Sequence, residues 1–179
     1  MDKYVYSFGR GRAEGSSLMR NLLGGKGCEL AEMSNLGIPV PPGFTITTQA
    51  WAHYTRGGRQ WPDGLDAQVN EALARLEEDT GLKLGDPERP LLVSVRSGAR
   101  VSMPGMMETI LNLGLNDKTV EGLAHRTGDE RFALDCYRRF LAMFGAVVLG
   151  IRREAFDELL EAAKHRLGVA ADPDLPAEE

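Results

Sequence analysis

The segment Leu91–Gly114, "LLVSVRSGARVSMPGMMETILNLG", joins two β-rich runs through a loop of unusual composition. The run "LLVSVRS" predicts a buried strand that ends at Arg96, and "TILNLGL" predicts a second strand. Between them, Gly105 permits close backbone approach or a positive φ. The three methionines of "SMPGMM" argue against a solvated loop, because large apolar side chains favour burial. The segment therefore predicts an ordered apolar loop beside an arginine.

The residue types in and around this loop suit a purine nucleotide. Met103 and its neighbours offer polarizable walls for a flat ring, and Glu108 and Thr109 offer polar contacts at the rim. Arg96, at the end of a rigid strand, can present its planar fork to phosphate oxygens. The residues alone leave two alternatives open, namely that the methionines fill a core and that Arg96 forms a structural ion pair.

A second glycine-rich stretch, "LLGGKGCELAEMSNLGIPVPPGF", predicts a helix from Lys26 to Leu36 that Gly37 ends. Backbone N–H groups and the helix dipole attract phosphate at such a start, and Lys26 adds a positive charge. The stretch is not a P-loop, because Gly27 stands where a serine or threonine would follow the lysine. A glycine-rich turn with a solvated lysine is the alternative.

Two further elements are expected before the loop. "FTITT" predicts a short strand, and Thr47 or Thr48 can cap the helix that follows it. Residues Asp63 to Thr80 have the spacing of an amphipathic helix, with Asp63 as the N-cap and Gly81 as the stop. The first part of the chain, residues 1–115, is therefore predicted to be mixed α/β.

The second part, residues 116–179, is predicted to be a helical subdomain. Asn116 or Asp117 caps a short helix, a longer helix runs from about 129 to 149, and a third carries apolar residues from 156 to 167. The end, "AADPDLPAEE", has the capping residues of a further helix that is truncated. A frayed acidic tail is the alternative.

Composition narrows the classes of function. The net charge of the 179 residues is −5, which argues against a general nucleic-acid or membrane-surface binder. Residues 1–62 carry seven Lys/Arg and four Asp/Glu, a local charge of +3 that suits a small anionic ligand. Cys28 and Cys136 stand alone, so a reducing cytoplasm is expected. Neither the histidines nor the acidic residues show the spacing of a metal site.

Three segments together resemble the amino-terminal region of pyruvate, phosphate dikinase: "LGGKGCELAEMSNLGIPVPPGFTITT", "LLVSVRSGARVSMPGMMETILNLGLND" and "FLAMFGAVVLGI". The resemblance implies an α+β fold, the first lobe of an ATP-grasp domain with a helical inserted subdomain. In that family the amino-terminal domain binds Mg·ATP and passes its β,γ-pyrophosphoryl group to a histidine on another domain. Phosphate and pyruvate then each take one phosphoryl group, which yields AMP, pyrophosphate and phosphoenolpyruvate.

The resemblance also implies roles for individual residues. Lys26 matches the phosphate-binding lysine of the family, and Arg96 matches the arginine that contacts the phosphates. Gly105 and Thr109 match the loop that closes over the nucleotide. Glu108 stands where the family usually has aspartate, a departure that can shift the contact at the rim of the loop.

Much of the family's machinery lies outside the 179 residues. The second lobe, which supplies the adenine hinge and the acidic magnesium ligands, is not recognisable, nor is the phosphohistidine motif, so no catalytic residue is predicted. The chain is expected to bind ATP weakly, to turn nothing over and to have the remaining dikinase domains as partners; dimers are usual for the full enzymes. Two alternatives are a free-standing degenerate ATP-grasp module and a segment of a phosphoenolpyruvate synthase, which the methionine-rich loop disfavours.

Overall fold

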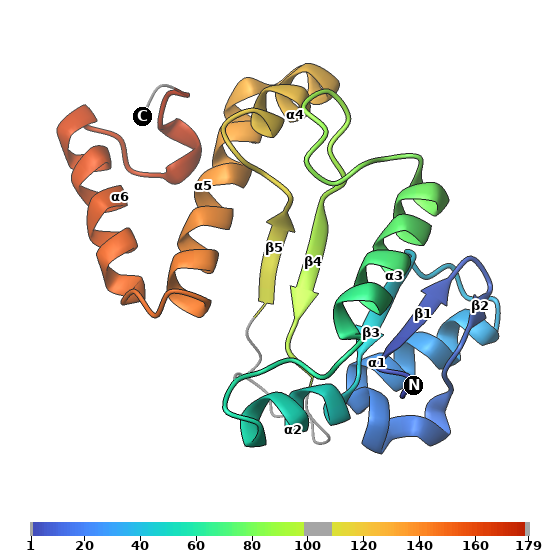
Figure 1. The fold of residues 1–179 in the computed structure, drawn as a ribbon. Coiled ribbons are helices and arrows are strands. Elements are labelled where there is room, and N and C mark those ends of the chain that lie inside the picture. Colours follow the sequence, from blue (N-terminus) through green and yellow to red (C-terminus); the bar gives the residue numbers. More distant parts are fainter. Residues whose placement is uncertain (1, 99–108, 178–179) are drawn as a thin grey trace. The chain divides into compact units, whose positions relative to one another are not determined.

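The computed structural model describes residues 2–98 and 109–177, and its contacts divide the chain into two compact units (Figure 1). The described residues of the first unit are 2–81 and 97–98, and those of the second are 82–96 and 109–177. Both units combine helices with antiparallel strands, which confirms the mixed α+β class.

The first unit is built on a three-stranded antiparallel sheet in the order β2-β1-β3, with β1 in the centre. Phe8 of β1 pairs with Gly43 on one side and with Ala13 on the other. Helices α1 and α3 pack against β1. The elements are β1 (Val5–Gly9), β2 (Arg12–Ala13), η1 (Ser17–Met19), α1 (Arg20–Asn35), β3 (Gly43–Ile46), α2 (Thr48–Arg56) and α3 (Leu65–Thr80).

The predicted elements of this unit are present, with one correction to a cap. Thr47 caps α2, because its side-chain oxygen accepts a hydrogen bond from the Ala50 N–H at 3.3 Å. Asp63 does not cap α3. Gly64 is the N-cap instead, in the left-handed conformation. The Leu65 N–H donates to the Pro62 carbonyl, so a turn precedes the helix. Gly81 ends α3 as predicted, with a φ of 66°.

The second unit packs helices on a two-stranded hairpin. Helix α5 lies against both β5 and α4, and this contact forms the main core around Ile110, Ala133 and Phe140. The elements are β4 (Val93–Arg96), β5 (Thr109–Leu113), α4 (Thr119–Thr127), α5 (Glu130–Val147), α6 (Arg153–Leu167) and η2 (Asp172–Asp174).

The hairpin corrects the prediction of a buried strand at β4. Leu91, just before the strand, is buried, but the exposed fraction of Val95 is 44%. Strand β4 pairs with β5 in the hairpin, and helix α5 packs against β5 rather than against β4. The contacts place both strands in the same compact unit as helices α4, α5 and α6. The predicted domain boundary between residues 115 and 116 stays a prediction.

Capping hydrogen bonds support the predicted helix starts at Asp129 and Asn116. Asp129 caps α5, because its carboxylate accepts the Phe132 N–H at 2.8 Å. Helix α4 is assigned from Thr119, and Asn116, the first of the two residues predicted as its cap, makes the capping hydrogen bonds. Its side-chain oxygen accepts the backbone N–H groups of Lys118 and Thr119 at 2.9 and 3.0 Å, and its backbone carbonyl accepts the Val120 N–H at 3.0 Å.

A carboxyl clasp holds the end of the described chain against α5 and α6. The guanidinium of Arg131 donates to the backbone carbonyls of Leu175, at 2.9 Å, and of Asp172. The carboxylate of Asp172 lies 3.2 Å from Lys164 of α6 and 3.4 Å from Arg138 of α5. Because these contacts fix the segment and Leu175 is buried, the frayed-tail alternative is wrong for residues 172–175.

Two results bear on the environment of the chain. Within residues 2–98 and 109–177, none of the helices combines the length and apolar character that crossing a bilayer needs. Cys28 is buried and Cys136 is half-buried, and both are free thiols.

The close approach of α4 to the loop between α3 and β4 gives a first prediction. A Cβ at Gly122 would lie 2.0 Å from the Pro87 carbonyl oxygen, which is backbone and cannot easily yield. Although alanine is favoured over glycine in helices by about 1 kcal/mol, we expect Gly122→Ala to lower the free energy of unfolding by about 2 kcal/mol. Urea denaturation followed by circular dichroism measures this change. Gly98→Ala, where a Cβ meets open space, is the control, and equal stability of both variants would contradict the packing.

The second prediction concerns acid stability. Burial raises the pKa of the Asp135 carboxyl, but the hydrogen bond from Arg138 and the charges of Arg138, Arg139 and Arg131 outweigh it, so the pKa lies below its ordinary value. A depressed folded-state pKa contributes stability above the unfolded pKa that is lost as the pH falls through the folded one, here below about pH 4. We expect Asp135→Asn to be less stable than wild type at pH 7, with a smaller difference at pH 3. A difference in urea unfolding that is the same at both pH values would refute this.

Candidate functional site

The glycine-rich stretch around Lys26 is a break inside a helix. The predicted helix start at Gly24–Gly27 is present, but a first helical segment precedes it, because the 3-10 turn η1 leads directly into helix α1 at Arg20. At Gly24 the backbone leaves helical geometry, with φ 71° and ψ 175°. A second helical segment then starts at Gly25, one residue before the predicted start.

This break creates the polar start of a helix in the middle of α1. A helical hydrogen bond closes over intervening residues that must all be helical, so Gly24 interrupts the regular ladder. Residues Gly25–Gly27 form the first turn of the new segment. The first turn of a helix is where backbone N–H groups generally lack intrahelical partners and the dipole is positive. Such a turn attracts anions.

Close packing fixes the position of this turn. A Cβ at Gly27 would lie 2.9 Å from the Thr45 side-chain oxygen, so the turn approaches β3 as only glycine permits. Cys28 is fully buried behind it. On the other side of the break, the Thr48 hydroxyl donates to the Asn21 carbonyl oxygen at 2.6 Å. Sequence reasoning assigned no role here to Thr45, and it gave Thr48 only a capping role, although the run "FTITT" that carries both follows the turn.

Lys26 lies on this turn with its charge uncompensated by acids. Its ammonium group donates to the Ser97 carbonyl oxygen at 3.4 Å, a contact within the first unit. Across residues 2–98 and 109–177 it has no carboxylate within ion-pair distance. Lys26 is therefore a half-buried cation that can meet an anion.

The second unit brings two other predicted site residues together. Arg96 and Thr109 are direct partners in the β4–β5 ladder, which places a guanidinium and a hydroxyl at the end of one hairpin. Arg96 is exposed and has no carboxylate partner in the described part of the chain, so the alternative of a structural ion pair finds no support there. Met103, Gly105 and Glu108 lie outside the described residues.

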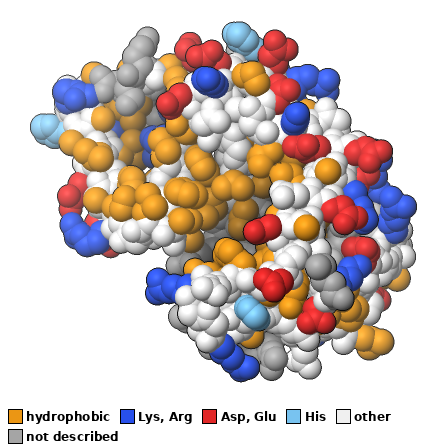
Figure 2. Space-filling model, viewed as in Figure 1, with side chains coloured by type: hydrophobic (Ala, Val, Ile, Leu, Met, Phe, Trp, Pro, Cys, Tyr) orange, Lys and Arg blue, Asp and Glu red, His pale blue; other side chains and the backbone are white. Residues whose placement is uncertain are grey.

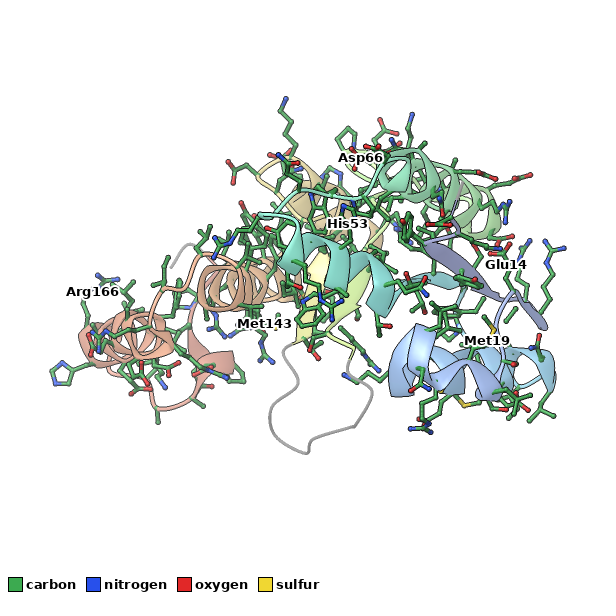
Figure 3. The ribbon with its side chains drawn as sticks, turned by 60° about the horizontal axis from the view of Figure 1, so that its bottom comes forward. Glu14, Met19, His53, Asp66, Met143 and Arg166 are labelled. Atoms are coloured by element: carbon green, nitrogen blue, oxygen red, sulfur yellow. The ribbon has the colours of Figure 1, made fainter. Side chains whose placement is uncertain are left out.

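The surface hollows lie elsewhere. One of about 470 Å³ follows α2 and is lined by Gln49, Ala52, His53, Arg56 and Gly57, with His53 on that helix (Figure 3). Another, of about 300 Å³, lies near β1 and α3 beside Glu14 and Arg75. Neither contains a predicted site residue. In the described ranges, no group of His, Cys, Asp and Glu has the arrangement of a metal site.

Comparison with known proteins identifies relatives. Residues 20–79 match the family described as "Pyruvate phosphate dikinase, AMP/ATP-binding domain". The chain is 58% identical, over its whole length, to 20% of pyruvate, phosphate dikinase from Rhizobium meliloti (strain 1021), and 54% identical to 20% of the Clostridium symbiosum enzyme. It is 55% identical, over 98% of its length, to 18% of pyruvate, phosphate dikinase 1, chloroplastic, from Arabidopsis thaliana.

The chain is therefore homologous over its whole length to part of pyruvate, phosphate dikinases, with residues 20–79 matching their AMP/ATP-binding domain, and the resemblance recognised in its sequence is confirmed. It spans about a fifth of the length of the curated relatives it matches.

The break at Gly24 yields the third prediction. Its φ and ψ belong to a region that only glycine occupies at low cost, so Gly24→Ala should lower the free energy of unfolding by about 1–3 kcal/mol. D-alanine at the same position adopts this geometry without strain, and ligation at the natural Cys28 allows its insertion. We expect the D-alanine protein to unfold at higher urea concentration than the L-alanine protein. Equal losses for both would show that bulk, not backbone geometry, requires glycine here.

Proposed function

We propose that the chain forms the first lobe of the ATP-grasp domain of a pyruvate, phosphate dikinase, with residues after Asn116 as its helical inserted subdomain. The observation that carries this proposal is the helix restart at Gly24–Gly27, which carries Lys26, a cation with no carboxylate partner among the described residues. It falls within the region that matches an AMP/ATP-binding domain. The three compared relatives are all named pyruvate, phosphate dikinase, which favours a dikinase over a phosphoenolpyruvate synthase.

Each predicted residue then has a task in binding. The N–H groups of Gly25–Gly27 and the Lys26 ammonium hold phosphate oxygens, because both supply positive potential at one place. Arg96 adds a bidentate donor to the phosphates, and Thr109 fixes the end of the covering loop beside it. Gly105 lets that loop approach the nucleotide, with Met103 and Glu108 at its rim.

The chain binds and orients ATP but performs no chemistry alone. Transfer of a pyrophosphoryl group needs spread charge neutralised from several sides and water excluded, which one lobe cannot do. We assign the Mg²⁺ ligands to the second ATP-grasp lobe, as the family resemblance implies. The phosphohistidine, the pyruvate site and the dimer contact of the full cytoplasmic enzyme are likewise assigned to polypeptide outside this chain.

The fourth prediction tests the nucleotide site. Isothermal titration with Mg·ATP should give weak binding by the isolated chain, and Lys26→Ala and Arg96→Ala should each weaken it about tenfold, as expected for loss of a hydrogen bond to a charged group. Lys118→Ala and Arg12→Ala are matched controls on exposed residues and should leave affinity unchanged.

Two outcomes would count against the proposal. Submicromolar binding by the isolated chain would contradict a half-site. In an assay of phosphoenolpyruvate formation with the remaining dikinase polypeptide supplied in trans, activity that neither Lys26→Ala nor Arg96→Ala lowers would remove both residues from the site.

A further inference from the structure

The turn between α5 and α6 carries an apolar surface that the nucleotide site does not use. Val148, Leu149 and Ile151 form this apolar tip, with exposed fractions of 52%, 64% and 43%. They belong to the segment "FLAMFGAVVLGI", for which the proposed binding function gives no reason. Large side chains exposed at neighbouring positions are uncommon unless a partner covers them.

The backbone of the tip is held in one conformation. The N–H of Val148 donates to the Phe144 carbonyl at 2.9 Å, and the N–H of Ile151 donates to the Gly145 carbonyl at 3.0 Å. Gly150 completes the turn with a φ of 69°. The pattern is that of a glycine-closed helix end, so the apolar side chains project from an ordered support.

Packing of α6 on α5 makes the support rigid. A Cβ at Gly145 would lie 2.4 Å from the Phe156 ring, so the ring rests directly on the backbone of α5 one turn before the tip. The apolar surface also continues along α5, because Leu141 lies seven residues before Val148 and its exposed fraction is 47%. Figure 2 shows one face of the molecule, on which hydrophobic side chains lie among charged ones.

The charges around the tip define what fits it. The segment from Ala142 to Ile151 contains no charged residue, and two arginines, Arg152 and Arg153, follow at once. Both are exposed, and neither has an ion pair with another described residue. A complementary surface is therefore apolar at its centre and acidic at its rim.

We propose that the apolar tip docks on an apolar, acid-rimmed surface in the part of a dikinase polypeptide that these 179 residues do not contain. This rests on the proposed function. The chain covers 20% of the Rhizobium meliloti relative, so about four-fifths of that protein is available to supply the surface.

The carboxyl clasp places the end of the described chain on the same unit as the tip. It holds residues 172–175 on the same two helices that carry the tip, so polypeptide that continues in the relatives leaves from this unit. Helix α5 has 18 residues and is about 27 Å long, a distance that about eight extended residues span. Either a following segment or a separate domain can therefore reach the tip.

The test measures binding between this chain and the Rhizobium meliloti dikinase that lacks its matching fifth. Isothermal titration should detect a complex, and the double variant Val148→Ser with Leu149→Ser should weaken it at least tenfold. Leu18→Ser, at a leucine that is 93% exposed in the first unit, is the matched control and should bind as wild type does. Arg152→Glu should weaken binding more at low salt than at high salt.

Several results would overturn the proposal. These are equal affinities of the tip variant and the control, absence of any complex, or self-association of the chain that the tip variant abolishes. If the shortened dikinase does not fold, this chain replaces the matching fifth in the full Rhizobium meliloti enzyme. There the tip variant should lower the unfolding temperature more than Leu18→Ser, and equal temperatures would overturn the proposal.

Failure of this inference is separable from failure of the proposed function. Docking through the tip does not use Lys26 or Arg96, so substitutions there should leave the complex intact. A chain that binds nucleotide through Lys26 but ignores the shortened dikinase would disprove the docking alone.

Discussion

The backbone break at Gly24 is the constraint on which the candidate site depends. A continuous helix through residues 20–35 would consume the N–H groups of Gly25–Gly27 in its own hydrogen bonds. The glycine-only conformation at position 24 releases that turn, and close packing of Gly27 on Thr45 holds it in place. The glycine backbone at position 24 and this tight packing thus set the position of the turn, whose residues Gly25 and Gly27 are themselves buried.

The electrostatics of the candidate site depend on cations that have no carboxylate partner in the described ranges. Some basic groups in the described part of the chain meet a carboxylate, as Arg138 meets Asp135, and are neutralised within the fold. Lys26 and Arg96 have no such partner in the described ranges, so their positive potential is available to a ligand.

The second unit combines a stable core with surfaces that await partners. Helix α5 is anchored on β5 and α4, whereas α6 contributes no buried residue and depends on Phe156 and on the carboxyl clasp. The apolar tip lies at the turn joining these two helices. We propose that this face is covered in the larger enzymes, of which the chain matches about a fifth.

The sequence by itself determined the elements, because hydrophobic periodicity and capping side chains act over a few residues. It correctly gave the strand "TILNL", the caps at Thr47 and Asp129 and the stop at Gly81. It also gave the family, through motifs around Lys26 and Arg96. Only the tertiary structure decided that α1 begins before its glycines and breaks at Gly24. It also decided that β4 is largely exposed, and that contacts with α5 and α6 hold residues 172–175. These depend on contacts between distant residues, which local periodicity does not encode.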